Sequence, residues 1–239
     1  MMKTITLLRV NLLAAALLTF SPIFAQEEST FEISASADLV SRYVWRGVHT
    51  ASASIQPGLT ASWKGLSLTA WGSTDFTTDG KEVDLTLGYE AGGFNIAVTD
   101  YWWTTDGEST PYGNYSANHY FEGTIGYNFG ESCPLTLTWN TMFGMDGDKN
   151  EEGKQRYSTY VEATYDFTVK GVDLTAGIGV SPWTGMYHRE GKTGFALSTI
   201  SVKATKGLKI TDSFTLPVFV QGIIAPNQNT TFLVFGISL

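Results

Sequence analysis

The sequence predicts an all-β protein, a single up-and-down antiparallel transmembrane β-barrel of about 12 strands. After its first 25 residues the chain consists of short segments in which apolar and polar residues alternate, and it ends on such a segment, 231–239. The connections between these segments are alternately tight and long. A barrel in lipid must close on itself so that every backbone polar group is paired, which leaves one face of each strand for lipid and the other for the lumen.

A period of two residues defines the strands in order along the chain. In the first strand, apolar residues at the odd positions from Phe31 to Leu39 alternate with polar residues at the even positions. The fourth strand, 82–90, and the eighth strand, 156–167, alternate in the same way. The remaining strands are expected near residues 54–63, 66–76, 93–103, 118–129, 134–144, 171–181, 195–206, 213–223 and 231–239.

Two of these segments are irregular. The segment 195–206 changes phase between Leu197 and Ile200, which predicts a β-bulge. Pro217 interrupts the segment 213–223, where it removes a backbone donor from the ladder.

The connections favour a membrane barrel over a soluble sandwich. Even-numbered connections are compact, as in Lys64-Gly65 and Lys170-Gly171, whereas odd-numbered ones such as 104–117 and 182–194 are mostly longer and more polar. An up-and-down barrel places the two sets on opposite rims, and outer-membrane barrels have short periplasmic turns and long outer loops. A soluble sandwich has no reason to sort its loops in this way.

The N-terminus predicts export. Lys3 and Arg9 supply a basic region, an apolar stretch follows, and Ala25 is the small residue that ends it, so we expect a signal peptide over 1–25 and an outer-membrane barrel domain over 26–239. Removing the signal leaves 13 Lys and Arg against 23 Asp and Glu, a formal net charge of −10. Nucleic acid is therefore excluded as a partner, because phosphate binding needs a basic surface.

Aromatic residues are expected in two bands at the ends of the strands, which is where the two headgroup interfaces of a bilayer favour them. The outer band comprises Tyr43, Trp45, Trp102, Trp103, Phe143 and Trp183. The periplasmic band comprises Trp63, Tyr89, Phe94, Tyr127, Phe129, Tyr165, Phe167 and Phe214.

Several motifs in the first third of the exported chain resemble the TorF-like family of porins. They are Ser41-Arg42-Tyr43-Val44-Trp45-Arg46-Gly47, Gln56-Pro57-Gly58, Trp71 and Glu82-Val83-Asp84-Leu85-Thr86-Leu87-Gly88-Tyr89. In that family the first strand carries a similar Ser-x-Tyr-x-x-Arg-Gly pattern. The resemblance implies an outer-membrane barrel with a channel role.

The predicted inner face combines small polar residues with charged ones. Arg42 and Arg46 are four apart at the end of the first strand, so we expect both to point inward and Tyr43 and Trp45 to face outward. Near the outer rim the inward arginines share a level with carboxylates, which either form a constriction that orients polar solutes or pair and close the lumen. The candidate lumen residues are Arg42, Arg46, Glu82, Asp84, Glu122, Arg156 and Glu162.

These features favour a porin of the bacterial outer membrane through which small polar solutes diffuse passively. Its expected partners are outer-membrane lipids, lipopolysaccharide, the barrel-assembly machinery and the solutes; no catalytic residue, metal site or cofactor is expected. One alternative is a closed barrel whose long outer loops serve as an adhesin, receptor or scaffold. Another is an outer-membrane lipid hydrolase, because His119 lies near an outer loop with Ser116 close by in sequence, although no Gly-x-Ser-x-Gly motif is present.

Overall fold

The structure is a computed structural model that describes residues 31–105, 107–144 and 147–239. In these ranges the chain forms fourteen β-strands. No helix in the described part of the chain is long and apolar enough to cross a membrane. The signal peptide expected over 1–25 lies outside the described residues.

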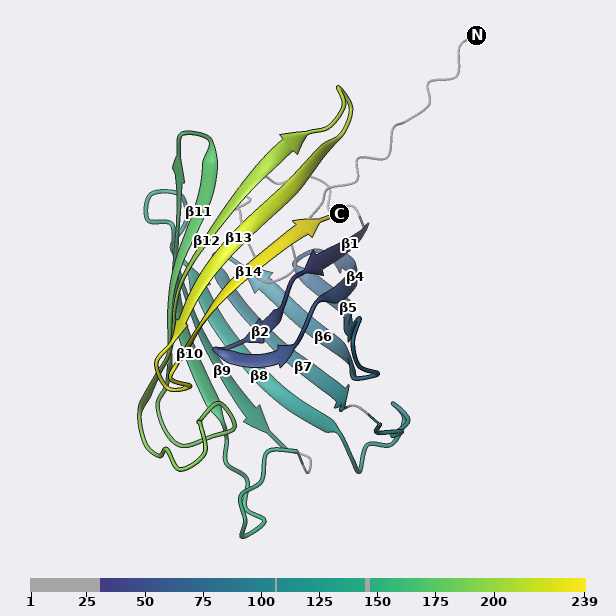
Figure 1. The fold of residues 1–239 in the computed structure, drawn as a ribbon, viewed down its shortest axis with the longest axis vertical. Helices are drawn as coiled ribbons and strands as arrows, with labels where there is room; N and C mark the ends of the chain where they lie inside the picture. Colours follow the sequence, from purple (N-terminus) through teal and green to yellow (C-terminus); the bar gives the residue numbers. More distant parts are fainter. Residues whose placement is uncertain (1–30, 106, 145–146) are drawn as a thin grey trace.

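Twelve strands close into one antiparallel barrel in which neighbours along the chain are neighbours in space (Figure 1). This confirms the predicted all-β, up-and-down barrel of about 12 strands. The barrel strands are β1 (Glu32–Val40), β4 (Ser54–Trp63), β5 (Leu66–Asp75), β6 (Lys81–Ala91), β7 (Phe94–Thr104), β8 (His119–Asn128), β9 (Leu135–Phe143), β10 (Thr159–Val169), β11 (Val172–Ser181), β12 (Ala196–Lys209), β13 (Thr215–Ala225) and β14 (Thr230–Ser238).

The remaining two strands, β2 (Tyr43–Trp45) and β3 (Val48–Ala51), form a separate two-stranded sheet within the first long connection. The barrel itself closes where β1 meets β14, through the register pairs Asp38↔Ser238 to Val40↔Gly236. Beyond these pairs, the backbones of Ala37 and Leu239 exchange hydrogen bonds of 3.0 and 2.8 Å.

Connections on one rim are short because their residues adopt the positive φ angles that tight hairpins need. Lys64 and Gly65 have φ of 50° and 81°, and Lys170 and Gly171 have 51° and 74°. Positive φ at both central residues is the type I′ turn, whose twist matches that of the paired strands. The long connections lie together on the opposite rim, at the bottom of Figure 1, so the predicted sorting of loops is confirmed.

Side chains alternate between the two faces of the wall as the sequence predicts. On β6, Leu85, Leu87 and Tyr89 are exposed on the outer face, while Glu82 and Asp84 are buried on the inner face. The outer wall is therefore rich in exposed large apolar side chains.

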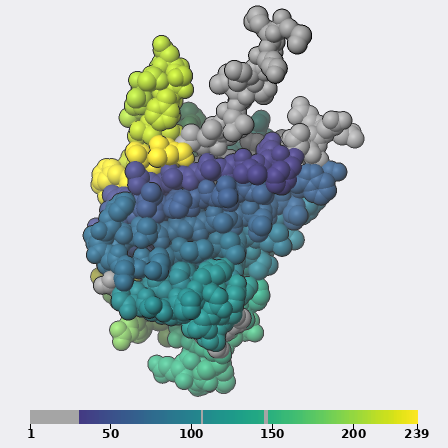
Figure 2. Space-filling model, turned by 90° about the vertical axis from the view of Figure 1, so that its right-hand side faces the viewer, coloured from purple at the N-terminus to yellow at the C-terminus, as the bar shows by residue number. Residues whose placement is uncertain are grey.

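Both predicted irregularities lie where β12 meets its neighbours. The β11–β12 ladder pairs Gly179 with Thr199 and Val180 with Leu197, so one residue of β12 is extra and the predicted bulge is confirmed. Pro217 is accommodated on β13 opposite Gly207, beyond the point where the β13–β14 ladder begins. The β12–β13 hairpin projects past the neighbouring strands, in lime at the top of Figure 2.

The predicted aromatic bands differ in outcome. On the short-turn rim, rings such as Trp63, Phe94 and Tyr165 are exposed on the outer wall, as expected. Phe143 and Trp183 are likewise exposed near the long-loop rim. Four other residues of the outer band do not form an exposed belt, because the chain carries them into the lumen or under a loop: Tyr43, Trp45, Trp102 and Trp103.

The lumen contains an apolar core that the sequence analysis did not predict. Val40, Phe219, Ile223 and Val234 are buried on the inner face of β1, β13 and β14, and Val44 of the β2–β3 hairpin packs against them. These inner positions are apolar because a folded hairpin, rather than water, faces them. Burial of this apolar surface holds the hairpin against one wall of the barrel.

The first test concerns this internal core. Phe219→Ala removes a buried aromatic ring. The ring packs directly against Gly236, where a Cβ atom would lie only 2.2 Å from it. We expect the free energy of unfolding to fall by about 3–5 kcal/mol. Phe235→Ala is the matched control, because Phe235 is 54% exposed on the outer wall. Urea unfolding in detergent micelles should give a clearly smaller loss for Phe235→Ala, and equal losses would contradict the internal core.

Candidate functional site

The candidate site is built around the β2–β3 hairpin inside the lumen. β1 ends at Val40, and the next strand, Tyr43–Trp45, pairs with Val48–Ala51 instead of continuing along the barrel wall. The expectation that Arg42 and Arg46 extend the first strand is therefore wrong, although Arg46 does enter the lumen.

The hairpin turns at Arg46 and Gly47, whose φ angles of 51° and 83° match those of the Lys64-Gly65 turn. The Arg46-Gly47 pair is thus a type I′ turn rather than a strand segment. The tip reaches the wall at β12 and β13, because a Cβ at Gly47 would lie 2.6 Å from the Ser198 carbonyl oxygen. Glycine is required here by both the positive φ and the close approach.

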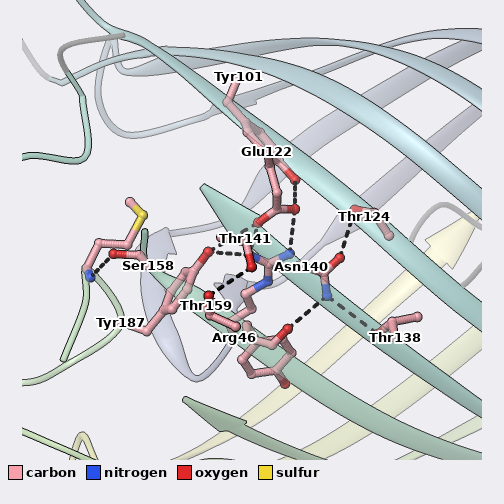
Figure 3. A network of polar contacts seen from close by, with 12 residues as sticks. Arg46, Tyr101, Glu122, Thr124, Thr138, Asn140, Thr141, Ser158, Thr159 and Tyr187 are labelled. Atoms are coloured by element: carbon pink, nitrogen blue, oxygen red, sulfur yellow. Dashed lines mark hydrogen bonds and ion pairs between the residues drawn. The ribbon is translucent and has the colours of Figure 1, made fainter. Parts of the chain in front are cut away.

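Arg46 extends from the hairpin tip to the far wall, where it meets Glu122 of β8 (Figure 3). Its Nη2 donates to Glu122 Oε1 at 2.8 Å, and its Nη1 donates to Oε2 and to the Tyr187 hydroxyl. The Tyr101 hydroxyl donates to Glu122 Oε1 at 3.0 Å. Paired N–H groups on one carboxylate form the two-point arrangement that arginine favours, which fixes direction as well as distance.

Aromatic rings enclose the Arg46 guanidinium. Its Cζ lies 4.6 Å from the Trp45 ring centroid, 5.0 Å from that of Tyr160 and 5.1 Å from that of Tyr187. The side chains of Arg46 and Glu122 are only 9% and 1% exposed. Ring faces attract a cation most strongly where water is excluded, so this cage offsets part of the cost of burying the charge.

Two of the long loops close over the hairpin. Tyr187, in the connection between β11 and β12, is 1% exposed, and the side-chain amides of Asn227 and Gln228 each donate to its carbonyl oxygen at 2.9 Å. The connection between β9 and β10 joins this cover through Ser158, whose hydroxyl accepts the Met186 N–H at 2.7 Å. These contacts join the loops around Tyr187, whose hydroxyl also contacts the Arg46 guanidinium.

The inner wall beside Arg46 is lined by a chain of amide and hydroxyl groups. The Thr124 hydroxyl donates to Asn140 Oδ1 at 2.9 Å, and Asn140 Nδ2 donates to the Tyr160 carbonyl at 3.1 Å (Figure 3). The Tyr160 hydroxyl donates to Glu162 Oε1 at 2.9 Å and forms a hydrogen bond of 2.7 Å with the Thr199 hydroxyl. Glu162 thus faces the lumen as predicted and is held by a tyrosine.

Glu82 and Asp84 lie on the inner face of β6, on another side of the hairpin. The Tyr43 side chain of the hairpin lies beside Glu82. Among the described residues, Asp84 Oδ1 has no hydrogen-bond partner. Glu82, Asp84 and Glu122 therefore all lie on the inner face of the barrel, where Arg46 forms its ion pair with Glu122.

The other two predicted arginines lie elsewhere. Arg42 is exposed, with its guanidinium 5.7 Å from the Phe232 ring centroid of β14. Arg156 is exposed in a loop, because β10 begins at Thr159 and Tyr157 has a φ of 52°. The expectation that Arg156 lies on the inner wall is therefore wrong.

Sequence reasoning missed the residues that form the cage, chiefly Trp45, Tyr160 and Tyr187. Trp45 was expected to face lipid because it alternates with arginines, and Tyr187 lies in a loop without periodicity. The one signal that could have revealed the hairpin is Arg46-Gly47, a basic residue followed by glycine as in the predicted turns Lys64-Gly65 and Lys170-Gly171.

A second polar cluster lies on the outer wall beneath the connection between β7 and β8. His119 Nδ1 contacts Asp100 Oδ1 at 2.7 Å, and its Nε2 contacts the Tyr112 carbonyl at 2.6 Å. Tyr115 stacks on the imidazole with ring centroids 4.0 Å apart. Both ring nitrogens are thus engaged in holding the loop against the wall.

The fold and this site define a class of protein: a closed twelve-stranded barrel whose lumen contains a hairpin anchored by a buried ion pair. A family model matches residues 24–214, so the chain belongs to this family, described as a bacterial protein of unknown function (Gcw_chp). The matched range includes the hairpin, Glu122, Tyr160 and Tyr187. No curated protein matches the chain. The resemblance to TorF-like porins remains an interpretation of the sequence.

The second test concerns the ion pair. Arg46→Ala leaves Glu122 buried and unpaired, so we expect the free energy of unfolding to fall by about 3–5 kcal/mol. Arg42→Ala is the matched control; because Arg42 is exposed, its removal should change that free energy by about 0.5 kcal/mol or less. Urea unfolding followed by tryptophan fluorescence measures both variants.

The double variant Arg46→Ala, Glu122→Ala separates the pair from its surroundings. Removing both charges leaves neither one stranded, so its loss of stability should be smaller than the sum of the two single losses. Strict additivity would show that the two side chains do not interact in solution.

Proposed function

We propose that this protein is a β-barrel of the bacterial outer membrane that works as a narrow channel for small polar solutes, with the β2–β3 hairpin restricting the lumen. The observation that carries the proposal is the hairpin itself, which is anchored to the far wall through Arg46 and Glu122. A barrel that only had to be closed could fill its interior with wall side chains, as eight-stranded barrels do. Here a separate chain segment, the β2–β3 hairpin, occupies the lumen.

The outer wall supports the membrane location. Large apolar side chains are exposed on most strands, for example Leu59, Leu87, Ile125 and Leu233. Continuous apolar exposure of this kind is unfavourable in water and favourable against acyl chains. Outer-membrane lipids, lipopolysaccharide and the barrel-assembly machinery are accordingly the partners we propose.

The inner wall toward the short-turn rim supports the channel. It includes small polar side chains that form hydroxyl pairs, such as Thr60 with Thr69, both partly accessible, and Thr86 with the buried Thr99, each pair at 3.0 Å. Small hydroxyl groups occupy little volume and hydrogen-bond to water, so this half of the lumen suits a hydrated solute. The hairpin then determines whether the two halves communicate.

A second candidate is a closed barrel that presents its long loops as an adhesin, receptor or scaffold. It is favoured by the contacts that tie the loops into one surface, namely Met186 to Ser158 and Ser158 to Asp148, whose Oδ1 accepts the Ser158 hydroxyl at 2.6 Å. For the lipid hydrolase, His119 offers no free ring nitrogen to activate a hydroxyl, because Asp100 and the Tyr112 carbonyl engage both.

The third test measures conductance with and without the hairpin. Val40 pairs directly with Ser54, so residues 41–53 can be replaced by Asn-Gly, which closes a two-residue hairpin. In planar bilayers we expect small or rare conductance steps from the native chain and larger, frequent steps from the replacement variant. Heat-modifiable migration on gels confirms that the variant folds.

A point variant keeps the hairpin in place and provides the control. Glu122→Gln weakens the anchor without shortening the side chain, so openings should become more frequent while the largest step stays below that of the replacement variant. A folded replacement variant that conducts no better than the native chain would refute the channel and favour the loop-presenting barrel.

The fourth test concerns the membrane-facing wall. Leu85→Arg places a charge on the outer face of β6, where a basic residue near the bilayer midplane costs about 2–4 kcal/mol. Thr86→Arg changes the adjacent residue, whose hydroxyl faces the lumen beside Thr99. We expect Leu85→Arg to lower the refolding yield in lipid vesicles much more than Thr86→Arg, and the opposite order would contradict a lipid-facing outer wall.

A further inference from the structure

Asp84 lies between two aromatic side chains on the inner wall. The register pairs Asp84 of β6 with Trp71 of β5 on one side and with Tyr101 of β7 on the other. Directly paired residues of antiparallel strands point to the same face, so all three face the lumen. Glu82, two residues before Asp84 on β6, faces the lumen as well. The ring centroids of Tyr43, on the hairpin, and Trp71 are 5.7 Å apart.

The charges around Asp84 do not balance. Its acidic neighbours on the inner wall are Glu82 and Glu122, whereas Asp100 lies on the outer face of β7 beside His119. Arg46 is engaged by Glu122. Asp84 is only 8% exposed, and its Oδ1 has no hydrogen-bond partner among the described residues. A carboxylate in this position is costly unless a cation or a donor reaches it.

The Arg46 guanidinium shows how the interior of this barrel binds a cation. The Arg46 guanidinium is bound by one carboxylate, Glu122, and by the faces of Trp45, Tyr160 and Tyr187. Asp84 and Glu82 repeat this combination of carboxylate and aromatic ring on the neighbouring wall, without an arginine of their own.

We propose that Asp84 and Glu82, together with Trp71 and Tyr101, bind a small ammonium-type cation, such as the head of a primary amine. The unpaired Asp84 oxygen accepts an N–H of the ligand, and the aromatic rings lie beside its positive charge. Within the described residues, no three or more His, Cys, Asp or Glu side chains are grouped to hold a metal ion. This proposal rests on the proposed channel, for which it names cationic amines as the favoured solutes.

The experiment titrates methylammonium chloride into the refolded protein in detergent micelles, with sodium chloride replaced mole for mole so that ionic strength stays constant. Tryptophan fluorescence includes the signal of Trp71 beside Asp84, one of seven tryptophans, and the thermal midpoint reports on stabilisation by the ligand. We expect both signals to change and to saturate. No saturable change would overturn the proposal. An equal saturable response to potassium chloride would overturn the choice of an ammonium-type ligand.

Two variants localise the effect. Asp84→Asn keeps the shape of the side chain and removes its charge, so we expect the affinity for methylammonium to fall by about tenfold or more, which is about 1.4 kcal/mol. The same variant should be at least as stable as the native chain without ligand, because it removes an uncompensated charge. A merely structural Asp84 would instead be destabilised by the change.

The matched control is Asp166→Asn on β10, where the Thr175 hydroxyl already donates to the carboxylate at 2.5 Å. It should leave the methylammonium response unchanged. An unchanged response in Asp84→Asn as well would overturn the site. Since none of these readouts needs ion flow, saturable binding by a chain without conductance would retain the cation site and reject the channel alone.

Discussion

The interior of this barrel depends on the ion pair between Arg46 and Glu122. The arginine is on the tip of a short hairpin and the glutamate is on the far wall, so their contact determines how deeply the hairpin enters the lumen. Taking both charges out of water is expensive, and the two-point geometry with the ring faces of Trp45, Tyr160 and Tyr187 compensates for it. Without the pair, the hairpin would retain its apolar contacts with β13 and β14 and its aromatic contacts with β5 and β7.

The position of the hairpin explains why the inner wall has two different characters. Where Val44 faces β13 and β14, the wall is apolar and packed like a small protein core. Toward the short-turn rim, the inner wall carries threonines and other polar side chains, among them the carboxylate of Asp166. The acidic residues Glu82 and Asp84 lie on the inner face of β6, beside Trp71 and the Tyr43 ring that packs against it.

Most of the barrel could be predicted from the sequence because its strands and tight turns are specified by residues that are close together in the chain. Alternation over residues such as 82–90 specifies a strand with one apolar face, and Lys64-Gly65 specifies a tight turn, without reference to the rest of the chain. The inward direction of Glu82, Asp84 and Glu122 follows from the same alternation.

The site itself could not be predicted in the same way, because its contacts join residues that are distant in sequence. The alternation of the first strand continues past Val40 into the hairpin, so Arg42 and Trp45 fit a strand pattern that the backbone abandons. The alternation likewise continues through Tyr157. This residue has a positive φ, which a non-glycine residue does not reveal in the sequence. Only closure of the barrel brings Glu122 to Arg46, 76 residues away in sequence.

The most direct measurement of the central claim is the surroundings of the Trp45 indole in solution. The structure places its ring 5.4 Å from that of Tyr101 and 5.4 Å from that of Tyr187, between centroids. Nuclear Overhauser spectroscopy of the refolded protein in micelles, with tryptophan and tyrosine selectively labelled, should therefore show cross-peaks from Trp45 to both tyrosine rings and none to detergent acyl protons. Cross-peaks from Trp45 to the acyl protons, with none to Tyr187, would show that the hairpin lies outside the lumen and would contradict this account.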